Sequence, residues 1–278
     1  GCFLLRTRLL FYFVMIMLNK KLLVVLVVVL AVAGVIAANY VFKNDEMPPQ
    51  QSQTQNPDSN AVAGESPAEE PSPFANKPIN EVPRYTGRPL DEIVFGKGFS
   101  APEAAIEKRR GDLKVLAAVL TPNPMGSGGV DDWIAVGVIK KFFNDYEGTR
   151  DAWEYAGVLY PNNALSFANL GNLYAFYLND PAKAEFNFRK AISNDPYQPG
   201  YYLNLADFYR TAYVAKKSEA PKILLEGMSV IKDVNLVLAL ASYYRDNGDK
   251  TNALKYYQEV LKLSPNQLGI AEEIDRLK

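Results

Sequence analysis

The sequence Leu170-Gly-Asn-Leu-Tyr174 recurs 35 residues later as Leu205-Ala-Asp-Phe-Tyr209 and again as Leu240-Ala-Ser-Tyr-Tyr244. Each copy pairs a leucine with a small residue and places a tyrosine three positions after that small residue. Self-similarity at a fixed period of this length is typical of repeat proteins, in which each repeat is one supersecondary unit packed on its neighbours. The recurrence therefore predicts a stacked array of similar units in this part of the chain.

The pattern extends on both sides of these pentapeptides. A bulky residue stands three positions before each leucine, and the same places one period earlier hold Trp133, Val136 and Gly137. In the second and fourth copies a small residue, an aromatic residue, another small residue and a closing proline follow at equal spacing: Ala184, Phe188, Ala191 and Pro196, then Ala253, Tyr257, Val260 and Pro265. The first copy departs, with Lys140 for the tyrosine and Thr149 for the small residue, and the third copy lacks the closing proline.

Over residues 131–278 the chain therefore resembles the tetratricopeptide-repeat (TPR) family. The resemblance implies an all-α fold of about four hairpins, each made of a helix A and a helix B that pack antiparallel. Asp180 and Asp249 are placed to cap two of the B helices. Residues 266–278 are expected to form an amphipathic C-terminal capping helix whose apolar side chains are Leu268, Ile270, Ile274 and Leu277.

The composition argues against catalysis. The chain has 278 residues, no histidine, one cysteine, and 30 basic against 31 acidic residues. The missing histidine removes the commonest general base and metal ligand, and the single cysteine excludes a site built from several thiolates. No phosphate loop or nucleophile motif is present. We therefore expect a chain that is not an enzyme, holds no cofactor or metal, and has no affinity for nucleic acid, because its net charge is close to zero.

Residues 22–42 contain no charged side chain, and as a helix they would span roughly 31 Å, which is the thickness of a bilayer's hydrocarbon core. Lys20 and Lys21 precede this segment, so the positive-inside rule places the N-terminus in the cytoplasm and the repeats outside. The sequence thus predicts a single transmembrane helix in the cell membrane. Two alternatives are a cleaved signal peptide, which would yield a secreted protein, and a buried core helix.

The remaining boundaries follow from composition. Residues 1–21 are expected to be a short cytoplasmic segment, of which residues 1–16 are an upstream extension outside the native protein or the end of a fragment. Residues 43–100 are rich in proline and poor in large apolar side chains, which predicts a disordered linker. Residues 101–130 are expected to form a helix and a loop that lead into the array, with Ser100 as the helix cap and Gly111 as a weak point.

TPR arrays bind peptides or partner helices in a concave groove lined by the A helices, and the resemblance carries this role to twelve positions: Ile134, Val138, Lys141, Ala168, Asn172, Phe176, Leu203, Asp207, Arg210, Leu238, Ser242 and Arg245. Arg210 and Arg245 are equivalent residues one repeat apart, placed to pair with acidic groups of a partner. The sequence predicts a membrane-anchored scaffold that binds other proteins or peptides. The alternatives are a chaperone-like accessory factor of a secretion or envelope-assembly machine, and a structural component that self-associates.

Overall fold

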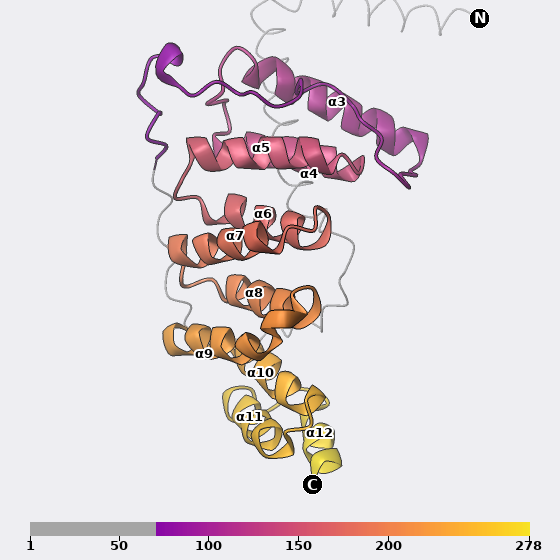
Figure 1. The fold of residues 1–278 in the computed structure, drawn as a ribbon, viewed down its shortest axis with the longest axis vertical. Helices are drawn as coiled ribbons and strands as arrows, with labels where there is room; N and C mark the ends of the chain where they lie inside the picture. The colour runs from indigo at the N-terminus through magenta and orange to yellow at the C-terminus, as the bar shows by residue number, and fades with distance from the viewer. Residues whose placement is uncertain (1–70) are drawn as a thin grey trace, which may run out of the picture. The chain divides into compact units, whose positions relative to one another are not determined.

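Four helical hairpins follow one another within residues 71–278, the part of the chain that the computed structural model describes (Figure 1). The first helix of each hairpin is its A helix and the second its B helix. The hairpins are α4 (Val130–Phe142) with α5 (Tyr146–Leu159), α6 (Ala164–Phe176) with α7 (Pro181–Asn194), α8 (Pro199–Thr211) with α9 (Ala220–Val230), and α10 (Val234–Asp246) with α11 (Lys250–Leu263). Helix α3 (Glu103–Leu120) precedes them and α12 (Ile270–Leu277) follows. The described residues contain no strand, and the expected all-α array of hairpins is confirmed.

The turns of three hairpins share one device. Asn144, Asn179 and Gly248 adopt a positive φ, a conformation that asparagine tolerates and glycine reaches without strain. The next residue in each case is an aspartate whose side chain accepts a hydrogen bond from a backbone N–H in the first turn of the B helix. The caps expected at Asp180 and Asp249 are therefore confirmed, and Asp145 is a third.

The third hairpin is built differently. A 3₁₀ helix, η2 (Val214–Glu219), lies between α8 and α9, and no aspartate caps α9. The longer connection explains why the third repeat departs most from the sequence pattern. Gly227 still takes the place of the small residue in this repeat, because a Cβ atom there would lie 2.8 Å from the ring of Tyr202.

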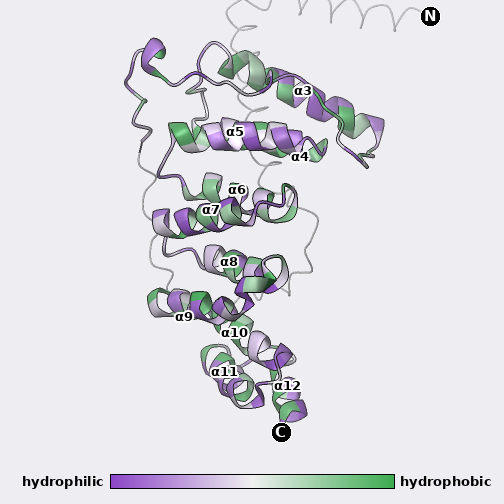
Figure 2. Cartoon of the chain, viewed as in Figure 1, coloured by the Kyte–Doolittle hydropathy of each residue, from purple (hydrophilic) through white to green (hydrophobic). Residues whose placement is uncertain are grey.

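Each A helix packs closely on its own B helix at a small residue. A Cβ atom on Gly171 would lie 2.5 Å from Cδ1 of Phe188, whose ring is fully buried. The helices carry apolar and polar residues on different faces (Figure 2), and the apolar faces form continuous hydrophobic clusters between neighbouring hairpins. The abundant aromatic residues of the array thus serve mainly as core.

The predicted linker ends too late in the chain. Residues 72–99, which we call the strap, lie at the same end of the stack as α3 and pack on the first hairpin (Figure 1). Val82 and Leu90 are buried in the core that α3, α4 and α5 share. Proline does not prevent this, since an extended segment needs few backbone donors. A disordered linker over the whole of 43–100 is therefore wrong for residues 72–99. Residues 43–70, together with the predicted segments 1–21 and 22–42, lie outside the described residues.

Helix α3 also differs in detail from the expectation. It begins at Glu103 after Pro102, and no side chain caps it, so the predicted cap at Ser100 is wrong. It runs without interruption through Gly111, because that position is exposed and the helix gains its stability from Leu113, Ala117 and Leu120 on the buried side. Strap and α3 together cover the apolar end of the first hairpin, as the ends of a repeat array require.

Helix α12 covers the other end of the array. Ile270 and Ile274 are buried against α10 and α11, as predicted, and Leu277 packs beside them. Leu268 is the exception, with 87% of its surface exposed, because α12 begins only at Ile270 and Leu268 belongs to the preceding turn. No helix in residues 71–278 combines the length and the apolar character that crossing a bilayer requires.

Candidate functional site

The twelve predicted groove positions lie on the four A helices, three on each, and we call this surface the A face. Ala168 and Leu238 are buried, and Ile134 and Leu203 are half-buried against the core. These four support the face from within. The positions left accessible to a partner are Val138, Lys141, Asn172, Phe176, Asp207, Arg210, Ser242 and Arg245.

One of these positions, Phe176, does not align with its equivalents in the other repeats. Lys141, Arg210 and Arg245 each follow the small residue of their repeat by four positions, whereas Phe176 follows Gly171 by five. Ala175 is the true equivalent, and it is buried. Phe176 nevertheless lies at the surface as the last residue of α6.

The first two repeats present apolar side chains on the A face. Val138 on α4 and Phe176 on α6 are exposed, and so is the neighbouring Tyr177, which the sequence analysis did not include. The Lys141 ammonium lies 4.6 Å from the centre of the Tyr177 ring, and the Tyr146 ring lies 4.7 Å from the same ring. A cation over an aromatic face is a favourable contact, so Lys141 and Tyr177 join the two repeats at the surface.

The last two repeats present charges that are already paired. Arg210 contacts Asp207 at 2.9 Å and Asp246 of the next repeat at 3.6 Å. Arg245 contacts Asp246 at 2.9 Å and Glu273 of α12 at 3.7 Å. Both arginines thus lie in one chain of surface ion pairs that crosses α8, α10 and α12. An acidic partner would have to displace these carboxylates. Two of the contacts, Arg210 with Asp246 and Arg245 with Glu273, join different elements, so the sequence pattern did not indicate them.

A second polar cluster ties repeat two to repeat three. The Tyr209 hydroxyl donates a hydrogen bond of 2.7 Å to Glu185 on α7, and Lys216 from η2 contacts the same carboxylate. Burial alone would raise the pKa of Glu185, but the hydrogen bonds from Lys216 and Tyr209 outweigh it and hold that pKa below its usual range. This cluster fastens the irregular third hairpin to its neighbour.

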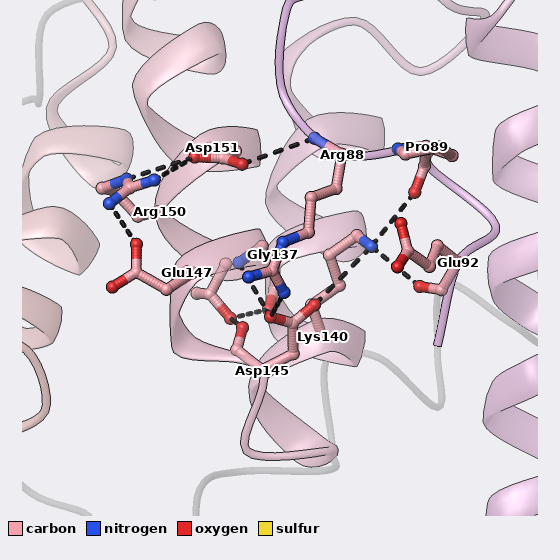
Figure 3. A network of polar contacts seen from close by, with 11 residues as sticks. Arg88, Pro89, Glu92, Gly137, Lys140, Asp145, Glu147, Arg150 and Asp151 are labelled. Carbon is pink, nitrogen blue, oxygen red and sulfur yellow. Dashed lines mark hydrogen bonds and ion pairs between the residues drawn. The ribbon is translucent and has the colours of Figure 1, made fainter. Parts of the chain in front are cut away.

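The first hairpin holds a network of buried charges (Figure 3). The side chains of Lys140 and Asp145 are only 1% and 2% exposed, and Lys140 Nζ lies 3.8 Å from Asp145 Oδ2. Asp145 Oδ1 accepts a hydrogen bond of 2.9 Å from Arg88 of the strap. Burial lowers the pKa of the Lys140 ammonium, and the Asp145 carboxylate acts in the opposite direction.

The network explains both departures of the first repeat from the sequence pattern. Lys140 replaces the usual tyrosine and donates to the backbone oxygens of Pro89 at 3.4 Å and Glu92 at 3.0 Å. Thr149 replaces the usual small residue, and its hydroxyl donates to backbone oxygens of the same hairpin. In the sequence, a lysine stands at a core position where the other repeats have a tyrosine. Because a buried ammonium needs polar partners, this residue type could have indicated that another segment covers the position.

Within residues 71–278 no three acidic, cysteine or histidine side chains gather in a way that could hold a metal ion.

Comparison with known families supports the hairpin architecture. The tetratricopeptide repeat family matches residues 164–198 and 234–267. These two segments cover α6 with α7 and α10 with α11, the two repeats whose consensus positions are all present in the sequence. No curated protein matches the sequence of this chain.

Among solved structures, a thermophilic TPR protein of Thermus thermophilus is similar, with 15% identity, 63% of this chain and 92% of the other covered, and a TM-score of 0.42. MamA is similar with 16% identity, 60% of this chain and 98% of the other, and a TM-score of 0.47. PilF of Pseudomonas aeruginosa is similar with 22% identity, 53% of this chain and 67% of the other, and a TM-score of 0.42. The helical hairpins and the two matched segments together show that this chain contains tetratricopeptide repeats.

Proposed function

We propose that this chain is a protein-interaction scaffold that binds a partner protein or peptide on the A face of its first two repeats. The observation that supports this most is the exposure of Val138 and Phe176 beside Lys141, on the helices that line the binding surface of such arrays. Exposed apolar side chains that gather into a patch with a polar rim are typical of interaction sites. The partner that this surface fits is a segment with an apolar side chain and a neighbouring acidic group for Lys141.

The proposal extends to a membrane anchor. Its support is the uncharged segment 22–42 with lysines before it, which would place the repeats on the extracytoplasmic side. Cleavage of that segment would give a secreted scaffold with the same binding face. The proposal includes no catalytic step, since the chain lacks histidine and no nucleophile motif is present.

A matched pair of double variants tests the binding face. Val138→Ser with Phe176→Ser removes two apolar side chains from A helices, where they are 41% and 42% exposed. Val158→Ser with Phe186→Ser makes the same changes on B helices, where they are 49% and 66% exposed. We expect the first pair to reduce the partner that copurifies with the full chain about tenfold or more, because anchor residues dominate binding energy. Quantitative mass spectrometry of the purified complexes measures this.

The second pair is expected to leave the copurified amount unchanged. Since all four sites are exposed, neither pair should alter the helical circular dichroism signal. Loss of the partner with the B-helix pair and its retention with the A-helix pair would place the binding site elsewhere.

A further inference from the structure

The strap lies on the first hairpin as a bound peptide lies on its receptor. The ring of Tyr85 contacts Trp133 of α4 at 5.1 Å and Tyr155 of α5 at 5.3 Å between ring centres. Leu90 is buried in the same apolar core. Two apolar anchors five residues apart therefore hold an extended segment across both helices.

Polar groups of the hairpin recognise the segment between these anchors and just after them. Arg88 donates from its side chain to Asp145 at 2.9 Å and from its backbone N–H to Asp151 at 3.4 Å. Lys140 donates to the carbonyl oxygens of Pro89 and Glu92 (Figure 3). The hairpin thus binds one charged side chain and several backbone groups, which is how peptide-binding surfaces combine specificity with affinity.

The strap owes its conformation to this surface. Its only helix is η1 (Ile79–Glu81), a single 3₁₀ turn, and the rest is extended or turning chain. It joins α3 through Ser100 and Pro102, both exposed, and Pro102 has an extended backbone conformation. No continuous helix or strand links the strap to the array. The contacts between strap and hairpin therefore depend on the sequence of the strap and not on its covalent connection to α3.

We propose that α3 and the first hairpin form a second peptide-binding site, separate from the A face, for an extended segment of the type Tyr-x-Gly-Arg-Pro-Leu, and that a second copy of this chain supplies the segment in trans. The strap of another copy satisfies every contact, because it is the segment that the site holds already. Reciprocal exchange preserves all contacts and changes only the connecting loop, which makes it a low-cost route to a dimer.

A full chain with a protease site inserted between Ser100 and Ala101 tests the site itself. After cleavage, a fluorescently labelled peptide of residues 72–99 is added and its incorporation is measured by anisotropy. We expect saturable incorporation that displaces the native strap. A peptide with Arg88→Ala should bind about tenfold more weakly or worse, since it loses a charge-assisted hydrogen bond.

A Tyr85→Phe peptide is the matched control. The Tyr85 hydroxyl is buried and has no hydrogen-bond partner among residues 71–278, so its removal should leave binding equal or tighter. Absence of incorporation, or loss of helical signal on cleavage, would overturn the proposal, because the strap would then be part of the fold and not a ligand. Equal binding of the Arg88→Ala peptide would overturn the assigned recognition.

The second copy is tested with intact full chains that carry two different affinity tags. They are mixed in detergent, incubated at high concentration and purified on one tag. We expect the other tag to copurify, and to do so about tenfold less when both copies carry Arg88→Ala. Two results would overturn the assignment of the second copy as occupant. One is copurification of the other tag that is the same with and without Arg88→Ala, and the other is no copurification in a protein that does bind the labelled peptide.

Discussion

Replacing Asp145 by alanine is expected to lower the free energy of unfolding by about 3–5 kcal/mol, because it leaves the Lys140 ammonium buried without a counter-charge. The same change removes the cap of α5 and the ion pair that holds Arg88 of the strap. Both tryptophans of the chain, Trp133 and Trp153, lie in this hairpin. Urea unfolding followed by tryptophan fluorescence therefore reports on the region where the loss occurs.

Asp180→Ala is the matched control, since Asp180 caps α7 in the same way but is only half-buried, and its ion-pair partner Lys183 is exposed. Loss of the cap alone should cost about 1 kcal/mol. If the two variants lose the same amount, the buried pair contributes nothing beyond capping, and Lys140 does not act as a buried charge that depends on Asp145.

Replacing Gly171 by valine is expected to cost about 3 kcal/mol. The new Cβ would lie 2.5 Å from a ring carbon of Phe188, and that ring is fully buried and packs against Phe208 of the next hairpin. Urea unfolding followed by far-ultraviolet circular dichroism measures the loss.

Gly111→Val on α3 is the control, because a Cβ atom at that helical position meets nothing within 4 Å. Its effect should stay within about 0.5 kcal/mol of zero, since valine and glycine differ little in helix propensity. A similar loss at both glycines would mean that valine disfavours the helix wherever it stands, and that the close approach of α6 and α7 is not the cause.

The array was predictable from sequence because its contacts repeat. Leu170, Gly171 and Tyr174 face the same kind of neighbour as their equivalents 35 residues later. The same packing therefore requires the same residue types in each repeat, and the pattern recurs in the sequence. The turn aspartates were predictable for a related reason, since a cap depends only on its own turn. Local and periodic contacts thus account for most of the fold that the sequence indicated.

The strap was not predicted because its contacts are neither local nor repeated. Val82 and Leu90 look like isolated apolar residues in a proline-rich stretch, and only the hairpin that covers them, some 50 residues later in the chain, gives them a partner. The ion pairs of Arg210 and Arg245 were missed for the same reason, because Asp246 and Glu273 come from other elements. Lys140 is the one residue whose type already indicated that another segment packs on the first hairpin.

The central claim, that the A face of the first two repeats binds the partner, is tested most directly by a photoreactive amino acid at Asn172 of the full chain in the native cell. A second chain carries it at Ser193, an exposed position on the B helix α7. The account predicts an adduct of one defined mass at position 172 and none at position 193. Adducts of many sizes would indicate a chaperone-like factor, and an adduct of twice the chain's own mass would indicate self-association. Adducts at position 193 with none at position 172 would contradict the claim.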